Sequence, residues 1–79
     1  MKIMEQDIKK IIAIFLKVDN IDSHESLFQQ GVDSLNMLQI LTEIESVYKI
    51  KIPYEELLIS NFETVGQICK LVEKLKEGK

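Results

Sequence analysis

The chain has 79 residues, of which 46% are hydrophobic, and a formal net charge of −3. This length predicts a single domain, residues 1–79, with a compact core but little room for an enclosed active site, so a self-contained enzyme is not expected. Cys69 is the only cysteine and His24 the only histidine, which excludes an internal disulfide and a metal cage of cysteines and histidines.

A single thiol also favours a reducing compartment. The longest apolar run, Ile11–Leu16, is too short to span a bilayer, and no small-residue cleavage site of a signal peptide follows it. We therefore expect a cytoplasmic protein.

Charge is distributed unevenly along the sequence. All ten basic residues are lysines, and they lie at or before Lys17 or at or after Lys49. The segment between these lysines has no fixed positive charge and carries six acids: Asp19, Asp22, Glu25, Asp33, Glu43 and Glu45. Such a surface repels nucleic acid and attracts partners with basic patches, so neither a nucleic-acid nor a membrane partner is expected. The simpler alternative is an acidic face that only aids solubility.

An amphipathic helix is predicted from Met4 to about Lys17. Its apolar residues recur at the three- and four-residue spacing of one helical face: Met4, Ile8, Ile11, Ile12, Phe15 and Val18. The segment Val18–Gly31 then loses this period and is rich in Asp, Asn and Ser, which predicts a long loop. Three apolar residues should attach this loop to the core: Ile21, Leu27 and Phe28. His24 is expected to be a solvated loop residue, and loops of this length are uncommon in compact domains unless they are functional.

A second helix is predicted to start at Asp33, whose side chain can cap it, with Gly31 in the turn before it. Its core stripe consists of Met37, Ile40, Leu41, Ile44, Val47 and Tyr48. Pro53 prevents simple continuation of this helix, and a short helix is predicted over Tyr54–Ser60.

Thr64 and Gln67 form a capping box that opens the last helix. The core face of this helix is predicted to hold Val65, Ile68, Leu71, Val72 and Leu75, with Cys69 at its edge as a packing residue. The pattern as a whole predicts an all-α fold: a small four-helix bundle with three main helices, a short third helix and a long first loop.

The start of the second helix combines a serine with apolar residues that lie off the core stripe. Leu35, Leu38 and Thr42 fall on the other side of the helical wheel, and Ser34 is near them at the helix start. No pattern places the single histidine as a base for Ser34, so a serine nucleophile is not expected. A helix N-terminus does suit a phosphate-bearing group attached to the serine, because free amides and the helix dipole favour negative charge there. The leucines could instead pack under the long loop or the short third helix.

The stretch GVDSLNMLQILTEIESVYKIKIP, with ESLFQQ before it and TVGQI after it, resembles the acyl and peptidyl carrier proteins. The resemblance implies the four-helix fold of the acyl-carrier type. It also implies that Ser34 receives 4′-phosphopantetheine from coenzyme A through a magnesium-dependent phosphopantetheinyl transferase, and that Asp33 is the neighbour in the motif that caps the helix. The arm ends in a thiol that holds acyl groups as thioesters. The implied partner-binding face consists of Leu35, Leu38, Thr42, Glu43 and Glu45.

Two positions depart from the pattern of fatty-acid carriers, which usually have acids where this chain has Asn36 and Gln39. The expected function is therefore that of a stand-alone, monomeric carrier protein in a polyketide, nonribosomal-peptide or amino-acid-loading pathway, which shuttles substrates between loading and processing enzymes with basic docking patches. The alternative is a helical adaptor that binds a partner through Leu35 and Leu38 without any covalent group.

Overall fold

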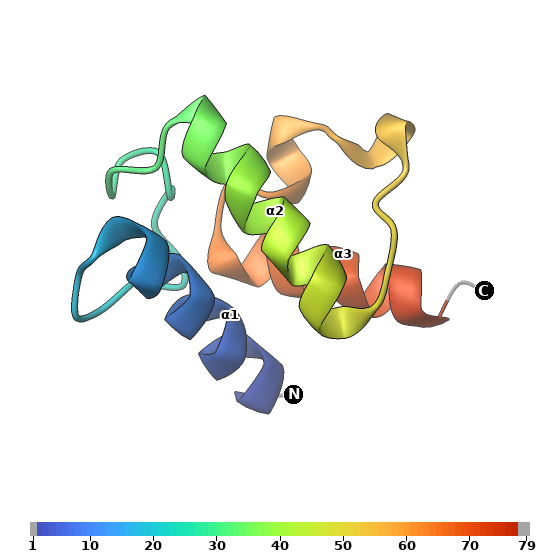
Figure 1. Ribbon diagram of the computed structural model, residues 1–79, viewed down its shortest axis with the longest axis horizontal. Helices are drawn as coiled ribbons and strands as arrows, with labels where there is room; N and C mark the ends of the chain where they lie inside the picture. Colours follow the sequence, from blue (N-terminus) through green and yellow to red (C-terminus); the bar gives the residue numbers. More distant parts are fainter. Residues whose placement is uncertain (1, 78–79) are drawn as a thin grey trace.

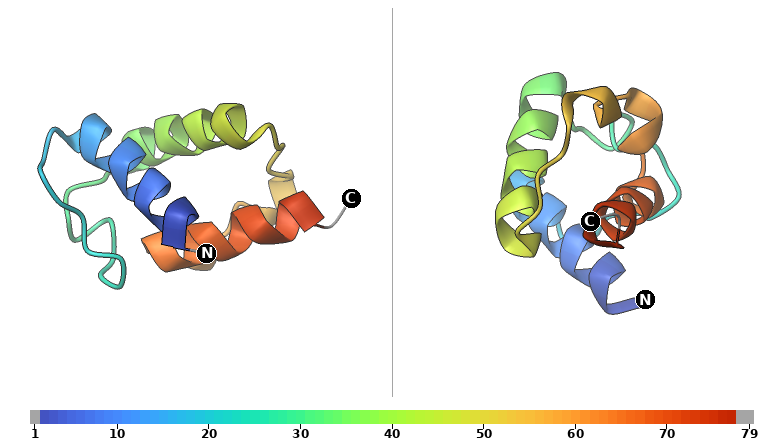
Figure 2. Two further views of the ribbon diagram at one scale, coloured as in Figure 1. Left: turned by 90° about the horizontal axis from the view of Figure 1, so that it is seen from below. Right: turned by 90° about the vertical axis from the view of Figure 1, so that its right-hand side faces the viewer.

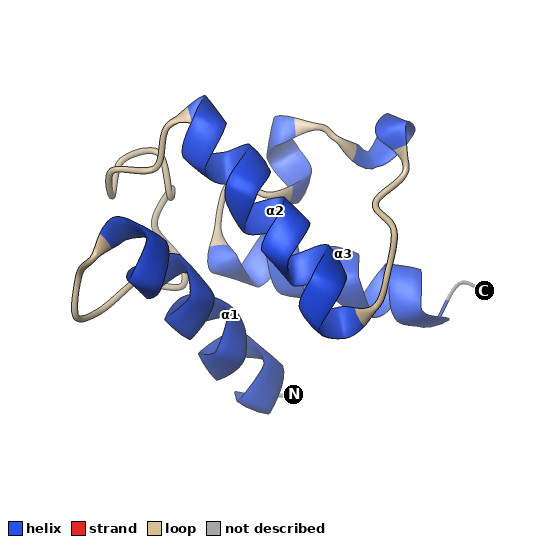
Figure 3. Ribbon diagram, viewed as in Figure 1, coloured by secondary structure: helices blue, strands red, loops and turns tan. Residues whose placement is uncertain are grey.

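Across the described residues, three α-helices and two 3₁₀ turns make up the regular structure. The computed structural model describes residues 2–77, so three residues of the expected domain, Met1, Gly78 and Lys79, lie outside the described residues. In chain order the elements are α1 (Lys2–Leu16), α2 (Ser34–Tyr48), η1 (Tyr54–Glu56), η2 (Ile59–Asn61) and α3 (Val65–Glu77), as Figure 1 shows. Within residues 2–77 there are helices and loops but no strand (Figure 3). The predicted all-α class is confirmed.

One core joins the three helices. α1 contacts both α2 and α3, and Figure 2 shows α1 crossing between them in two directions of view. The buried residues come from every helix, from the long loop and from the segment after α2, and they pack as one cluster: Ile8, Ile12, Ile21, Leu27, Val32, Met37, Ile40, Leu41, Ile44, Ile52, Val65, Ile68, Leu71 and Val72. Burial of this apolar surface is the main force that holds the helices together.

The first helix ends where the sequence predicts, but its last apolar residue is not in the core. α1 stops at Leu16, and Lys17 takes a left-handed conformation with φ of 58°. Val18, predicted to lie on the core face, is 43% exposed. That prediction is wrong because the chain leaves the helical path at Lys17, and beyond that point the period of the helix no longer decides where a side chain points.

The long loop between α1 and α2 is held against the start of α3. The Leu27 amide donates to the Glu63 carbonyl at 2.7 Å, and the Gly66 amide donates to the Ser23 carbonyl at 3.3 Å. Ile21 and Leu27 are buried and Phe28 packs against the core, which confirms the predicted attachment points. The Ser23 hydroxyl donates to the Glu5 carboxylate, so α1 also contacts this loop.

The stripe of α2 faces the core except at one edge. Met37, Ile40, Leu41 and Ile44 are buried, and Tyr48 packs against the core. Val47 is 48% exposed, so its predicted core position is wrong. On the helical wheel Val47 lies at the border of the stripe, next to Asn36, and in the last turn no neighbouring element covers that border.

The segment after Pro53 differs from the single short helix predicted over Tyr54–Ser60. It forms the two 3₁₀ turns η1 and η2, separated by Leu57 and Leu58. The Glu56 carboxylate links the segment to α3, because it accepts hydrogen bonds from Lys74 Nζ at 2.8 Å and from Asn61 Nδ2 at 3.1 Å. These long-range contacts stabilise turns that a helical pattern alone does not predict.

Candidate functional site

The candidate site is built around the first turn of α2. Gly31 has φ of 116°, a conformation that favours glycine, and it turns the chain so that Asp33 arrives extended at the N-cap. The Asp33 carboxylate accepts a hydrogen bond from the Asn36 amide at 2.7 Å, and the Asp33 carbonyl accepts the first helical bond from Met37 at 2.9 Å. The predicted cap is thus present, and it fixes the direction in which the next residue is displayed.

Ser34, the first residue of α2, is exposed to solvent. Its hydroxyl has no hydrogen-bond partner among residues 2–77, so no base activates it as a nucleophile in the described part of the chain. The N–H groups of Ser34 and Leu35 belong to the helix start, where amides lack intrahelical acceptors. A free hydroxyl beside free amides fits a phosphodiester-linked group, because the amides and the helix dipole stabilise its negative charge.

An apolar hollow of about 520 Å³ opens beside Ser34. Its lining comes from three parts of the chain, the loop before α2, α2 itself and the segment with η1 and η2: Phe28, Ser34, Met37, Leu38, Leu41, Leu57, Ile59 and Phe62. A group attached to Ser34 therefore starts at the rim of an apolar surface and not in open solvent.

Leu35 and Leu38 are exposed, at 65% and 58%. The alternative that they pack under the long loop or the segment after α2 is therefore wrong. Thr42 is exposed next to them, with its hydroxyl donating to the Leu38 carbonyl at 2.9 Å. These three residues and Ser34 form one solvent-facing flank of α2.

Four apolar residues that were not predicted from the sequence as part of the site face solvent from the neighbouring segment. They are Tyr54, Leu57, Leu58 and Ile59, with exposed fractions of 88%, 39%, 58% and 61%. The run of large apolar side chains after Pro53 is a signal that could have identified them, because so short a segment cannot turn all of these side chains toward the core.

The two glutamates of the predicted partner face differ in their surroundings. Glu43 is exposed and, among residues 2–77, forms no hydrogen bond or ion pair. Glu45 is half-buried, and its carboxylate accepts a hydrogen bond from the Ile52 amide at 2.7 Å. Glu45 therefore has a structural contact within the chain, whereas Glu43 is free for a partner.

The loop that leads to the site is organised by two polar side chains. The Asp22 carboxylate accepts hydrogen bonds from the amides of His24, at 2.7 Å, and Glu25, at 3.0 Å, and these bonds lower the pKa of Asp22. Gln30 accepts from the Asp22 amide at 2.9 Å and donates to the carbonyls of Asp22 and Glu25 at 3.1 and 3.0 Å. His24 is exposed, as predicted for a solvated residue.

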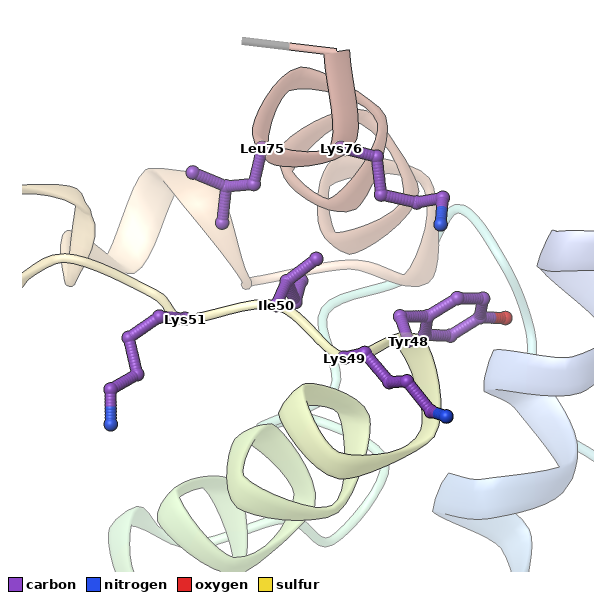
Figure 4. A pocket seen from close by; sticks show the side chains of 6 residues that line it. All are labelled: Tyr48, Lys49, Ile50, Lys51, Leu75 and Lys76. Atoms are coloured by element: carbon purple, nitrogen blue, oxygen red, sulfur yellow. The ribbon is translucent and has the colours of Figure 1, made fainter. Parts of the chain in front are cut away.

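A second hollow, of about 430 Å³, lies at the opposite end of α2. Tyr48, Lys49, Ile50, Lys51, Leu75 and Lys76 line it, and Figure 4 shows the amino groups of Lys49 and Lys51 pointing away from each other. The lysines do not converge on one point, so this hollow has no centre at which an anion would be held.

Cys69 and Tyr48 are the remaining reactive groups near the core. Burial raises the pKa of the Cys69 thiol, and the charges of Glu5 and Glu73 raise it further. Burial also raises the pKa of Tyr48, with a contribution from Asp7. The raised pKa favours the protonated form of both groups at neutral pH, which agrees with the predicted packing role of Cys69.

The described residues contain no group of three or more His, Cys, Asp or Glu side chains that could hold a metal ion. Within residues 2–77, every helix is also too short or too polar to cross a bilayer.

Comparison with known proteins places this geometry in a family. Residues 6–72 match the family model described as "Phosphopantetheine attachment site". The chain is 34% identical over 79 residues to the D-alanyl carrier protein of Streptococcus pyogenes serotype M5 (strain Manfredo), which covers 99% of this chain and 100% of that protein. It is 38% identical over 55 residues to the D-alanyl carrier protein of Streptococcus equi subsp. zooepidemicus (strain MGCS10565), covering 68% of this chain and 70% of the relative.

Solved structures show the same fold. A chain in the crystal structure of Bradyrhizobium japonicum glycine:[carrier protein] ligase complexed with glycylated carrier protein superimposes with a TM-score of 0.82. The match has 19% sequence identity and covers 87% of this chain and 97% of that chain. A second complex of the same ligase, with its cognate carrier protein and an analogue of glycyl adenylate, matches with a TM-score of 0.80 and 19% identity over 98% of this chain and 99% of that chain.

The chain belongs to the phosphopantetheine-binding carrier proteins, as the sequence resemblance implied. It is a carrier protein whose cofactor is 4′-phosphopantetheine. When bound, this arm supplies a thiol that holds acyl groups as thioesters.

Proposed function

We propose that Ser34 is the attachment point of the 4′-phosphopantetheine arm. The observation that carries the proposal is the isolated, exposed hydroxyl at the start of α2, which Asp33 caps and which lies at the rim of the apolar hollow. Asp33 acts as a positioning residue, because its bond to the Asn36 amide fixes the first turn and leaves the amides of Ser34 and Leu35 to face an attached phosphate.

The modification requires a partner enzyme, since residues 2–77 place no base beside the Ser34 hydroxyl. In this reaction Ser34 Oγ forms a bond to the phosphorus that bears the pantetheine in coenzyme A. The pyrophosphate bond of coenzyme A breaks, adenosine 3′,5′-bisphosphate leaves, and the hydroxyl proton passes to a base of the phosphopantetheinyl transferase, which uses magnesium. The carrier presents the serine and catalyses no step itself.

The cargo is an amino acid loaded by an adenylate-forming ligase. Support comes from the relatives, which are D-alanyl carrier proteins, and from the structural neighbours, which were solved with a glycine:[carrier protein] ligase. Asn36 and Gln39 agree with this assignment, because they remove acids that fatty-acid carriers usually have on α2. The protein acts as a monomeric carrier in the cytoplasm, with residues 1–79 as one domain.

Partner enzymes dock on the solvent-facing flank of α2 formed by Ser34, Leu35, Leu38 and Thr42, and on the exposed Glu43 that follows it. The exposed apolar residues Leu57, Leu58 and Ile59 extend this surface across the hollow. Apolar contact supplies affinity at such a surface, and the acidic centre of the chain steers basic partners toward it.

The test is coexpression with a phosphopantetheinyl transferase followed by intact-mass measurement. The wild type should gain the mass of one phosphopantetheine, Ser34→Ala should gain none, and the matched control Ser46→Ala, also an exposed serine on α2, should be modified like the wild type. Modification that persists in Ser34→Ala would disprove the assignment. An unmodified wild type across several transferases would favour the adaptor alternative, in which binding through Leu35 and Leu38 survives Ser34→Ala.

A measurement on protein from its native host identifies the cargo. Intact mass with the thioester preserved should show the arm plus one amino acid. A fatty-acyl or polyketide mass on the arm would refute the amino-acid assignment while leaving the role of Ser34 unchanged.

A further inference from the structure

A polar hollow of about 290 Å³ lies where the segment with η1 and η2 meets α3. We call it the α3–η2 hollow, and its lining residues are Glu56, Ser60, Asn61, Gln67, Lys70, Leu71 and Lys74. Ser60 directly follows Ile59, which lines the apolar hollow of Ser34. The same short segment therefore lines an apolar hollow and a polar one.

Three polar side chains of α3 form one wall of the α3–η2 hollow. Gln67, Lys70 and Lys74 are spaced by three and four residues, so they are neighbours on one face of the helix. This order places Lys70 between the other two. Lys70 is therefore the central hydrogen-bond donor of the wall.

Only one of the two lysines of this wall is free to bind a ligand. Lys74 Nζ donates to the Glu56 carboxylate at 2.8 Å, and Asn61 Nδ2 donates to the same carboxylate at 3.1 Å. Lys70 is exposed and has no ion pair or hydrogen bond among residues 2–77. The hollow thus carries one positive charge that the described part of the chain does not neutralise.

Two neutral donors line the hollow together with Lys70. Gln67 Oε1 accepts a hydrogen bond from the Thr64 amide at 3.2 Å, which holds the side chain in place, while Gln67 Nε2 has no partner within the described residues. Ser60 is exposed, and its hydroxyl is likewise unpaired among residues 2–77. An ammonium group, an amide N–H and a hydroxyl are donors from which a carboxylate can accept charge-assisted hydrogen bonds.

We propose that the α3–η2 hollow receives an aspartate or glutamate side chain of a partner enzyme, with the carboxylate bound to Lys70. The inference rests on the proposed carrier function, which supplies the partner. A partner that covers the exposed Leu58 and Ile59 reaches Ser60 at the next residue. A carboxylate fits better than a phosphate dianion, because one free cation balances a single negative charge and the nearby Glu56 carboxylate repels a second one.

This hollow gives the proposed docking surface a contact of opposite sign. The flank of α2 belongs to the part of the sequence that has acids and no lysine, whereas the free charge of the α3–η2 hollow is positive. A partner must then present a basic group and an acidic group in the matching order. A partner turned the other way brings like charges together, so Lys70 selects one orientation of docking.

The probe that tests the site is N-acetyl-aspartate methylamide, titrated into the full unmodified ¹⁵N-labelled chain at low salt and followed by NMR. Saturable shifts should concentrate at Ser60, Gln67 and Lys70, and the uncharged asparagine analogue should leave them unchanged. Lys70→Gln should weaken the association by about tenfold and Ser60→Ala by about threefold. Lys76→Gln removes an exposed lysine of the same helix that does not line the hollow, so this matched control should bind as the wild type does.

Three results would overturn the proposal: shifts spread over all the lysines, equal binding of the asparagine analogue, or equal binding by Lys70→Gln. Inorganic phosphate that binds the same residues more tightly than the aspartate probe would also reject a site for a carboxylate. Because the titration uses the unmodified chain, its failure is distinguishable from a failure of Ser34 to accept phosphopantetheine.

Discussion

The carboxylate of Glu45 accepts a hydrogen bond from the backbone amide of Ile52 at 2.7 Å, and so it ties the last turn of α2 to the chain that leaves it. Ile52 is buried in the core, so its amide needs this acceptor. The same helix carries Glu43 two residues earlier with no contact of this kind. The two acids look equivalent in the sequence, but Glu45 stabilises the fold whereas Glu43 is exposed to solvent.

Removal of the Glu45 side chain should destabilise the fold. We expect Glu45→Ala to lower the free energy of unfolding by about 1–2 kcal/mol, because the Ile52 amide loses its acceptor. Glu45→Gln should lower the free energy of unfolding by less than Glu45→Ala does, since its side-chain oxygen can still accept the hydrogen bond. The free energy of unfolding of Glu43→Ala should stay within about 0.5 kcal/mol of the wild-type value. Urea unfolding followed by circular dichroism measures the stability of all three variants. Equal effects of the Glu43 and Glu45 substitutions would contradict a structural role of Glu45 that Glu43 lacks.

The Gln30 side chain should hold the long loop between α1 and α2 in its folded conformation. Its side chain forms three hydrogen bonds with the backbone of Asp22 and Glu25, so Gln30→Ala is expected to lower the free energy of unfolding by about 1–2 kcal/mol. Hydrogen exchange of the Asp22, His24 and Glu25 amides should accelerate in this variant. Gln29→Ala, at an exposed neighbour, is the control and should leave both measurements unchanged.

Cys69 should react slowly with alkylating reagents in the folded protein. Because burial and the charges of Glu5 and Glu73 raise its pKa, less thiolate is present near pH 8 than in the unfolded chain, and alkylation should accelerate as the pH rises toward the elevated pKa. Intact mass after timed exposure to iodoacetamide, with and without urea, measures the difference. Equal rates in the two states would show that the folded environment does not protect the thiol.

Tyr48→Phe should leave stability unchanged or improve it. The Tyr48 hydroxyl is buried without a hydrogen-bond partner among the described residues, and its removal avoids the desolvation cost of an unpaired polar group. We expect a gain of up to about 1 kcal/mol in the free energy of unfolding, measured by thermal or urea unfolding. A loss of more than about 1 kcal/mol would mean that the hydroxyl makes a stabilising contact.

Local signals predict most of the fold. Asp33 and the Thr64–Gln67 capping box specify helix starts through side chains that bond to amides three residues away, and the structure contains each of these bonds. Gly31 supplies the turn before Asp33 through its positive φ. Failures occur where distant contacts decide the structure. The Glu56–Lys74 ion pair joins the segment after Pro53 to α3, and its partners are 18 residues apart, so no local pattern contains this contact.

The candidate site also has one part that local signals predict and another part that depends on contacts between distant segments. The helical wheel predicts that Leu35 and Leu38 leave the core, since their direction is fixed by α2 alone. The hollow beside Ser34 cannot be predicted from the wheel, because Phe28, Leu57 and Phe62 come from outside α2. The contact of Glu45 with Ile52 also depends on how the chain folds back after Lys49, where φ is 56°.

The lysines at the far end of α2 give the molecule an electrical polarity. Lys49, Lys51 and Lys76 gather around the hollow at the carboxyl end of this helix, about 20 Å from Ser34 by the rise of an α-helix. We expect a partner with a basic surface to be repelled at that end and attracted at the acidic end. Such a field favours approaches in which the proposed docking face beside Ser34 meets the enzyme first.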